Sequence, residues 1–272
     1  MDSSRPQSVA RACRAVLLAA EPAAKVRAAR AAARAWRRGG LAHVFDIAMP
    51  DRPARPDRPI LLPPGQMPKR GKGGSERGRV AMLHALAHIE FGAIDLAFDL
   101  AGRFGALFPP AFVGDWLGVG ADEAMHFALL DRRLRALGSC YGAMPAHDGL
   151  WEAAEATAGD ALARLAVVPM VLEARGLDVT PAIVERFRAA GDARSAALLE
   201  RIYRDEIRHV GAGSRWFLTL CEARRIAPVS EWQRLVRRHF RGVLKPPFNA
   251  SARDEAGLSR DYYAALAPSQ DV

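Results

Sequence analysis

The sequence predicts an all-α protein built around a four-helix bundle, with an N-terminal helical arm and an extra C-terminal helix. Ala is abundant and β-branched residues are few among the 272 residues, which favours helices. Four long segments with helical periodicity are joined by short connections, the usual pattern of a helix bundle. Half of the residues are apolar, enough to fill a sizeable core.

The N-terminal part differs from the rest of the chain. Residues 7–38 predict one helix, which Gly39 and Gly40 end. Seven prolines lie in residues 46–77, followed by glycines, and predict an extended linker that separates this helix from the bundle. The predicted organisation is an arm over 1–45, a linker over 46–77, a bundle over 78–250 and a tail over 251–272.

The bundle region contains the predicted long helices and the prolines and glycines that begin, bend or end them. The long helices are predicted over residues 78–104, 109–137, 150–175 and 192–224, with a short helix over 180–190 and a further helix over 229–241. Pro169 is expected to bend the third long helix because it removes one backbone hydrogen bond. Gly176 is expected to end that helix, and Pro181 to begin the short one. The chain after Pro247 is predicted to be irregular.

Cysteine usage and hydropathy indicate a cytoplasmic protein. Cys13, Cys140 and Cys221 are far apart and form no CxxC motif, so neither a disulfide framework nor a zinc–thiolate site is predicted. No uninterrupted apolar run approaches the roughly 18–20 residues that cross a bilayer, and the N-terminus lacks a signal-peptide pattern. We therefore expect no membrane span.

The net charge of +9 belongs to the N-terminal part. Residues 1–80 carry 17 Lys and Arg against 6 Asp and Glu, a net of +11, whereas residues 81–272 carry 22 against 24, a net of −2. A basic arm is compatible with RNA, acidic lipid or another partner. The alternative, which we favour, is a solvated basic helix and tail, so nucleic acid is a possible partner and not the favoured one.

Two Glu-x-x-His motifs carry the strongest chemical signal. They are Glu123 with His126 and Glu206 with His209, and each lies inside a predicted long helix. Positions i and i+3 share one face of a helix, so the carboxylate and the imidazole can hold one metal ion together. The alternative for either motif alone is an ordinary pair on a helix surface.

The other two long helices each offer a carboxylate between apolar neighbours. Glu90 lies 33 residues before Glu123, since 123 − 90 = 33, and Glu173 lies 33 residues before Glu206, since 206 − 173 = 33. This repeat is expected of two helix hairpins related by a pseudo-two-fold axis. The alternatives are an accidental spacing and a capping or ion-paired role for each Glu.

Charge balance then predicts a metal centre. Four carboxylates in a bundle core are costly unless cations neutralise them. Two divalent ions would do so, and ligands rich in carboxylate with few nitrogens and no thiolate favour iron or manganese over zinc. Two Glu together with two Glu-x-x-His motifs are the ligands of ferritin-like di-iron and di-manganese proteins. The predicted ligands are Glu90, Glu123, His126, Glu173, Glu206 and His209.

Other polar residues flank the predicted ligands. Those expected to support the site are Asp122, Asp205, Tyr203, Arg175 and Asp178. A separate helix face carries His84, His88 and Asp95, which we interpret as hydrogen-bonded packing or as surface residues of the bundle. His147 and Asp148 lie in a loop, where substrate contact competes with the favoured interpretation that Asp148 caps the next helix.

Several motifs together resemble a known family. They cover residues 87–90 (AHIE), 122–127 (DEAMHF), 145–151 (PAHDGLW), 171–181 (VLEARGLDVTP), 204–210 (RDEIRHV) and 247–249 (PFN). On these motifs, residues 78–250 resemble the ferritin-like DUF455 family of bacterial proteins. The resemblance implies the ferritin-like fold and the di-metal ligand pattern, without a substrate. Several better-known relatives in the superfamily are oxygen-activating enzymes, including a tRNA hydroxylase.

The expected function is that of a di-metal carboxylate protein, with iron as the expected metal and manganese as the alternative. We expect an oxygen-activating oxidoreductase of the hydroxylase or oxygenase type, acting on an unknown small-molecule or macromolecular substrate with an external electron donor. One alternative is a non-catalytic metal-binding scaffold or partner-binding protein. Another is an RNA-modifying hydroxylase that uses the basic N-terminal arm.

Overall fold

The computed structural model describes residues 7–68 and 75–268. Over these residues the chain is mostly helical, with a single two-stranded pair of short strands, which confirms the prediction of an all-α protein. It divides into two compact units, residues 1–151 and residues 152–272.

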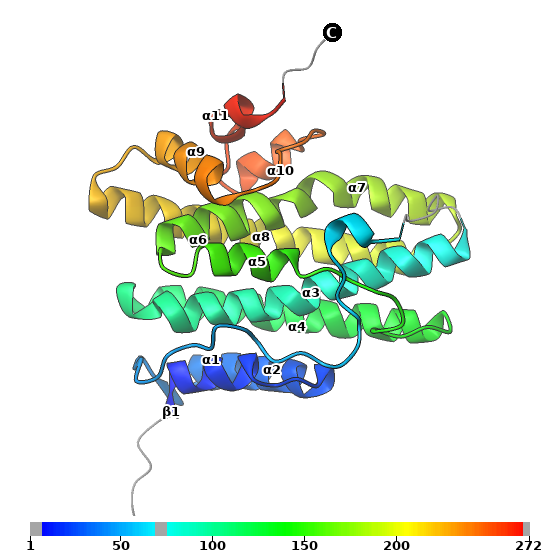
Figure 1. The fold of residues 1–272 in the computed structure, drawn as a ribbon, viewed down its shortest axis with the longest axis horizontal. Helices are drawn as coiled ribbons and strands as arrows, with labels where there is room; N and C mark the ends of the chain where they lie inside the picture. Colours follow the sequence, from blue (N-terminus) through cyan, green and yellow to red (C-terminus); the bar gives the residue numbers. More distant parts are fainter. Residues whose placement is uncertain (1–6, 69–74, 269–272) are drawn as a thin grey trace, which may run out of the picture. The chain divides into compact units, whose positions relative to one another are not determined.

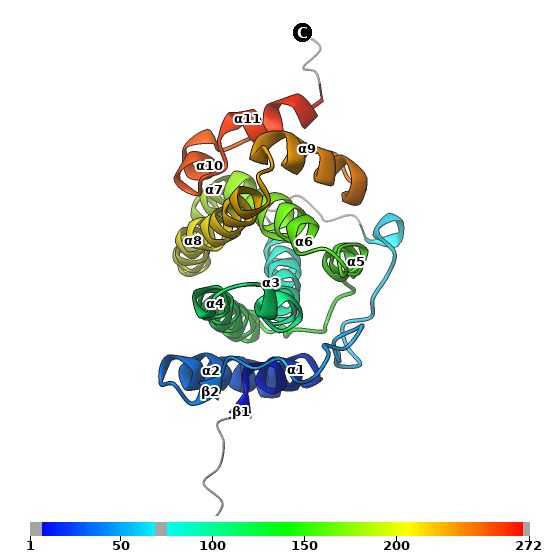
Figure 2. The same cartoon turned by 90° about the vertical axis from the view of Figure 1, so that its left-hand side faces the viewer.

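The first unit consists of two layers of helices. Its elements are β1 (Gln7–Ser8), α1 (Val9–Leu17), α2 (Pro22–Arg37), β2 (Leu41–Ala42), η1 (Pro64–Gln66), α3 (Glu76–Phe104), η2 (Gly105–Leu107) and α4 (Pro110–Ala136), and α5 (Gly149–Ala156) spans the boundary with the second unit. Figures 1 and 2 show α1 and α2 as one layer and α3 and α4 as the next. The layers meet because α1 packs on α3 and α2 packs on α4.

The N-terminal arm is two helices, and the prediction of a single helix over 7–38 is wrong. The chain leaves the helical path between α1 and α2, and Pro22 is the first residue of α2. Proline lacks an N–H and would break a continuous helix, but it suits the first turn of a new one. The Ser8 side chain begins α1 by accepting a hydrogen bond from the backbone N–H of Arg11 at 3.2 Å. The break lets both short helices lie against the α3–α4 layer.

Residues 43–63 form an extended segment that we call the strap. It has almost no regular secondary structure, as its prolines predicted, but it is hydrogen-bonded along its length to the first unit. Its bonds run from Arg103 Nη2 to Pro50 O (2.9 Å), from Trp151 Nε1 to Asp51 O (3.2 Å), from Ala54 N to Leu17 O (2.8 Å) and from Leu62 N to Ala146 O (2.8 Å). The strap therefore fastens the α1–α2 layer to α3 and to the loop before α5.

Helices α3 and α4 are the main hairpin of the first unit, and their observed ends lie within two residues of the predicted ones. They pack closely where Gly120 of α4 meets Phe98 of α3. A Cβ atom at Gly120 would lie 2.5 Å from the Phe98 ring. Because Gly120 has no side chain, the buried Phe98 ring can pack directly against the α4 backbone.

Replacing Gly120 with Ala is expected to lower the free energy of unfolding by about 1–3 kcal/mol, because the added methyl overpacks the core. Denaturant unfolding would measure it. Gly118→Ala is the matched control, since Gly118 lies on the same helix and a Cβ there meets nothing within 4 Å. This control is expected to be neutral or slightly stabilising. Equal effects of the two substitutions would contradict the close approach of Phe98.

The second unit contains the remaining helices. They are α6 (Ala161–Val167), η3 (Val168–Glu173), α7 (Ala174–Ala189), α8 (Ala193–Arg224), α9 (Pro228–His239), α10 (Ala250–Glu255), α11 (Arg260–Tyr263) and η4 (Ala264–Leu266). Helix α8 packs along α7, η3 and α6, and α9 to α11 cover the same group from another side, as Figure 2 shows. The short helices α10 and α11 correct the prediction of an irregular chain after Pro247.

The predicted third long helix is interrupted and then extended. The chain turns at residues 157–160, where the Asp160 side chain accepts a hydrogen bond from the N–H of Leu162 at 2.9 Å and begins α6. The buried Arg164 fixes this turn through Thr157 Oγ1 (2.8 Å) and Ala154 O (2.6 Å). The prediction of a continuous helix over 150–175 is therefore wrong at its beginning.

The end of that helix also differs from the prediction. Residues 168–173 form a π-helical turn that contains Pro169, and α7 then continues through Gly176 and Pro181. A wider turn accommodates a proline that has no N–H to donate. Gly213 of α8 faces this ring, and a Cβ there would lie 2.4 Å from Pro169 Cβ. Packing of α7 on α8 outweighs the weak helix propensity of Gly176, which costs about 1 kcal/mol.

One stretch, Glu76–Leu107, is long and apolar enough to cross a membrane by length and composition. Of its most apolar window, 72% is buried within the fold. That burial is typical of a core helix, so the stretch gives no clear membrane span.

Candidate metal centre

The first unit brings together three of the predicted ligands. Glu90 comes from α3, and Glu123 and His126 come from one face of α4, one turn apart. His126 Nδ1 lies 3.1 Å from Glu90 Oε2 and 3.4 Å from Glu123 Oε2. All three side chains are buried, and each offers a ligand atom within 4.8 Å of the others. We call these three residues the first triad.

The electrostatics of the first triad suit a cation. Burial and the charge of Glu123 raise the pKa of Glu90, while the hydrogen bond from His126 opposes that rise. Burial lowers the pKa of His126, but hydrogen bonds to Glu123 and Glu90 and their charges outweigh it and raise the pKa to about 11. The two buried carboxyl groups and the imidazole thus hold at least one proton among them. A metal ion can take the place of that proton, bound by two oxygens and one nitrogen.

The second unit holds the other three predicted ligands, Glu173, Glu206 and His209, which we call the second triad. Among the described residues, the group of potential metal ligands whose atoms lie within 4.8 Å of one another includes neither Glu173 nor His209, so the structure does not bring the second triad together as it does the first. Glu206 and His209 are buried on one face of α8, with Glu206 Oε1 3.6 Å from His209 Nδ1. Glu173 is half-buried and is the last residue of the π-helical turn. Such turns are frequent at functional sites because the extra residue rotates the side chains that follow. The turn was not predicted, although Pro169 signalled an irregularity there.

Asp178, predicted to support the metal site, anchors the C-terminal segment. Its carboxylate takes two hydrogen bonds from the buried Arg253, at 2.8 and 2.7 Å, and a third from the backbone N–H of Asn249 at 3.0 Å. The Asn249 side chain in turn begins α10. Within the 247–249 motif, Asn249 therefore caps α10.

Two further predicted supporting residues contact the same segment. Arg175 donates to the backbone carbonyls of Lys245 (2.6 Å) and Pro247 (3.2 Å). Tyr203, one turn before Glu206 on α8, accepts a hydrogen bond from the Asn249 side chain at 2.9 Å. These contacts link the C-terminal segment to the helices that carry the second triad.

The two aspartates that precede the Glu-x-x-His motifs lie in different surroundings. Asp205 is ion-paired with Arg208 on the same helix. Asp122 is half-buried on α4, one residue before Glu123. A supporting role for either one remains a prediction.

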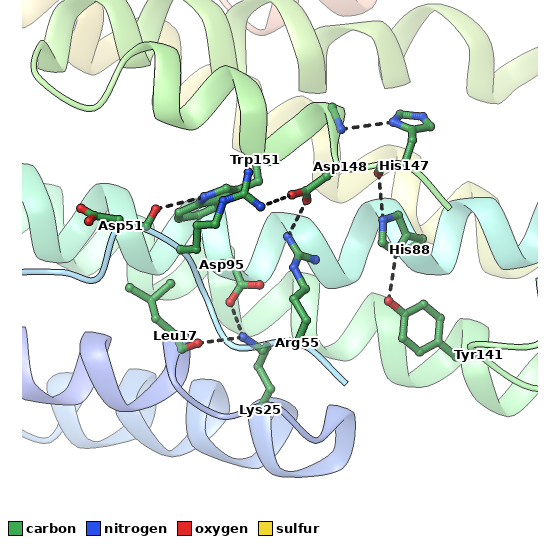
Figure 3. A network of polar contacts seen from close by, with 12 residues as sticks. Leu17, Lys25, Asp51, Arg55, His88, Asp95, Tyr141, His147, Asp148 and Trp151 are labelled. Carbon is green, nitrogen blue, oxygen red and sulfur yellow. Dashed lines mark hydrogen bonds and ion pairs between the residues drawn. The ribbon is translucent and has the colours of Figure 1, made fainter. Parts of the chain in front are cut away.

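The face of α3 away from Glu90 carries a second polar network. His88 Nε2 lies 3.1 Å from the His147 carbonyl, which can only accept, so Nε2 carries the proton. Nδ1 therefore accepts from the Tyr141 hydroxyl at 3.0 Å. Burial, followed by the charge of Arg55, lowers the pKa of His88 to about 4. Figure 3 shows this chain of contacts, in which His88 is a neutral connector between α3 and the 141–147 loop.

The same face holds a buried ion pair. Lys25 Nζ of α2 bonds Asp95 of α3, and both side chains are fully buried (Figure 3). Lys25 also reaches the Leu17 carbonyl at 3.4 Å and lies 5.4 Å from the centre of the Phe91 ring. A buried role for Lys25 was not predicted from the sequence. Lys25 lies four residues before Ala29, however, and therefore on the face of α2 that carries small residues. Asp95 is thereby a packing residue, one of the two roles expected for it.

Asp148 is held by the strap. Arg52 Nη1 and Arg55 Nη2 lie 3.0 and 3.2 Å from its two carboxylate oxygens. In place of an Asp148 cap, the backbone N–H of Gly149 donates to His147 Nδ1 at 3.2 Å. The favoured prediction of a capping Asp148 therefore missed the two arginines, which lie more than 90 residues earlier in the chain.

Comparison with known proteins identifies the family. The chain belongs to the family described as "Protein of unknown function (DUF455)", which matches residues 18–264. It is similar to an uncharacterized protein of Haemophilus influenzae (strain ATCC 51907 / DSM 11121 / KW20 / Rd), with 42% identity over 213 residues, 76% of this chain and 74% of the relative. No solved structure matches the chain. The DUF455 resemblance is confirmed, and the family description assigns no reaction.

Proposed function

We propose that this DUF455 protein is a di-metal carboxylate protein with a ferritin-like four-helix bundle. The bundle would comprise α3, α4, the α6–η3–α7 stretch and α8, with the two triads holding two ions in its core. The observation that carries this proposal is the first triad, in which two buried carboxylates converge on one imidazole at 3.1 and 3.4 Å.

The donor chemistry fits such a centre. Each triad supplies two carboxylates and one imidazole, so two divalent ions would balance four carboxylates. Such a ligand set, without thiolate, favours iron, with manganese as the alternative. The equal 33-residue spacings support a pair of related hairpins. We expect the protein to act in the reducing cytoplasm, where Cys13, Cys140 and Cys221 would remain free thiols, as they are in the structure.

The activity we propose is that of an oxygen-activating oxidoreductase of the hydroxylase or oxygenase type. Bound iron would supply the chemistry of O₂ reduction, with electrons from an external donor. The role of the chain is to hold the ligand oxygens and nitrogens in fixed positions and to keep bulk water away. Tyr203 and Arg175 would support the second triad indirectly, through the C-terminal segment that they contact.

Metal content and oxygen uptake test this proposal in sequence. Protein purified without oxygen is expected to hold about two iron or manganese ions per chain. The loaded protein is then expected to consume O₂ only when a reductant is added. Bound metal with no reductant-dependent uptake would favour the non-catalytic scaffold. No metal after reconstitution with ferrous ion would contradict the di-metal centre itself.

One observation favours a macromolecular variant of the same function, in which the substrate is RNA. Helix α2 carries Arg27, Arg30, Arg34 and Arg37 on its exposed side and contains no acidic residue. An RNA ligand predicts that the logarithm of the affinity falls steeply and linearly with the logarithm of the salt concentration. Binding that does not change with salt, or no binding, would remove this variant.

A further inference from the structure

A cavity of about 520 Å³ opens in the first unit, on the face of α3 that carries His84 and His88. Its volume lies in the range typical of small-molecule sites, roughly 300–1,000 Å³. Its walls come from the N-terminal half of α3, from residues 144–147, from Leu150 at the beginning of α5 and from the end of the segment before residue 69. Its apolar lining includes Met67, Ala81, Ala85, Ile89, Met144 and Leu150.

Hydrogen bonds assign the tautomers of two imidazoles in the lining, those of His84 and His147. His84 Nε2 accepts hydrogen bonds from the backbone N–H groups of Gly142 (3.0 Å) and Met144 (3.4 Å), so the neutral ring carries its proton on Nδ1. Burial lowers the pKa of His84, which agrees with a neutral ring. His147 Nδ1 accepts from Gly149, so its proton lies on Nε2. His84 and His147 therefore each keep one N–H group for a ligand, whereas His88 donates its own to the His147 carbonyl.

The charge of the lining is positive. Arg77 is the one charged side chain among the lining residues that the structure describes, and none of them is Asp or Glu. Ser75, also in the lining, caps the beginning of α3 by accepting from the backbone N–H of Gly78 at 3.1 Å. The beginning of this 29-residue helix adds the positive end of its dipole. The cavity thus combines an apolar wall with hydrogen-bond donors and a cation.

We propose that this cavity binds an amphiphilic organic anion, a carboxylate with an apolar body such as a fatty acid. The carboxylate would lie at the Arg77 guanidinium and the His147 Nε2–H group. The hydrocarbon would pack among Ala85, Met144 and Leu150. This site uses none of the six predicted metal ligands, so a test of anion binding does not depend on whether the di-metal centre exists.

Octanoate binding to the purified full-length protein tests the proposal, measured by isothermal titration calorimetry beside 1-octanol as the uncharged probe. Arg77→Gln is expected to weaken octanoate binding about tenfold or more, because a charge-assisted hydrogen bond is lost, and to leave octanol binding unchanged. Arg27→Gln, on the exposed side of α2, is the matched control and is expected to change neither. Equal binding of octanoate by the wild type and Arg77→Gln would overturn the anionic specificity.

Substitutions at two positions on the walls complete the test. Met144→Glu adds a negative charge to the lining and is expected to abolish octanoate binding, whereas the isosteric Met144→Gln retains it. Ala85→Trp fills the cavity and is expected to block both probes, with circular dichroism as the check on folding. Octanoate that binds Ala85→Trp or Met144→Glu as well as the wild type would overturn the site, as would no binding to the wild type at millimolar concentration.

Discussion

Replacing Glu123 with Gln is expected to remove metal from the first triad. Gln keeps the size of the side chain but loses the negative charge, and a neutral amide oxygen is a much poorer ligand for iron or manganese. Because Glu123 is buried beside Glu90 and His126, no solvent-exposed carboxylate can substitute for it without rearrangement. Metal content by mass spectrometry, before and after reconstitution with ferrous ion, would measure the loss.

The second triad offers a companion experiment. If the two triads together hold both ions, Glu123→Gln and Glu206→Gln are each expected to lower the content of both ions, because each ion would then depend on ligands of both triads. If they bind metal separately, each substitution removes only its own ion. Glu222→Gln is the matched control, since Glu222 lies on α8 with Glu206 but is exposed. Full metal content in both triad variants would contradict the assignment of these ligands.

Lys25→Met is expected to destabilise the fold by about 3–5 kcal/mol, the usual cost of leaving one member of a buried ion pair without its partner. Asp95 would keep a charge in a fully buried position. The double variant Lys25→Met/Asp95→Leu is expected to recover most of the loss, because replacing both charges with apolar groups restores packing. Arg30→Met, on the exposed side of α2, is the control. Denaturant unfolding would measure all four proteins.

The pH dependence of Lys25→Met and of a further single variant, Asp95→Leu, gives an independent check on the pair. Burial raises the pKa of Asp95 to about 6, while Lys25 and Arg55 lower it and Asp99 adds to the rise. Without Lys25 that pKa rises further, so the folded state binds the proton more tightly than the unfolded chain. The deficit of Lys25→Met is therefore expected to shrink as the pH falls from about 8 towards 5.

Asp95→Leu is expected to show the opposite trend. Burial lowers the pKa of Lys25, and Asp95 is the main group that opposes this effect. Without Asp95 the lysine loses its proton more easily in the folded state, so the deficit is expected to shrink as the pH rises towards 10. Deficits that do not change with pH would show that the pair is not buried as the structure has it.

The helices that could be predicted from the sequence are those whose ends are marked by residues close to them in the chain. The ends of α3, α4 and α8 follow from N-cap residues, prolines and glycines that act over a few positions. The first triad could be predicted because Glu123 and His126 form a Glu-x-x-His motif on one helix and Glu90 lies between apolar neighbours on another. In these cases local and tertiary preferences agree.

The remaining features depend on partners distant in the chain. Pro22 splits the arm, and the strap can be recognised only once its hydrogen-bond partners are known. Gly176 and Pro181 are breakers by propensity, but packing of α7 on α8 overrides them. His88 and Asp95 looked equally suited to a surface, because their partners come from α2 and from the 141–147 loop. No periodicity within α3 contains that information.

The strap has a consequence for the order of events during synthesis. Its partners Ala146, Asp148 and Trp151 leave the ribosome long after it does, since the bonds between them span up to 100 residues. Since translation adds about 5–20 residues per second, several seconds pass between synthesis of the strap and synthesis of these partners. Until then α1 and α2 have only part of their final surroundings, so the nascent chain presents apolar helix faces that α3 and α4 must cover. Slow elongation between residues 50 and 150 would lengthen the period in which chaperones can bind.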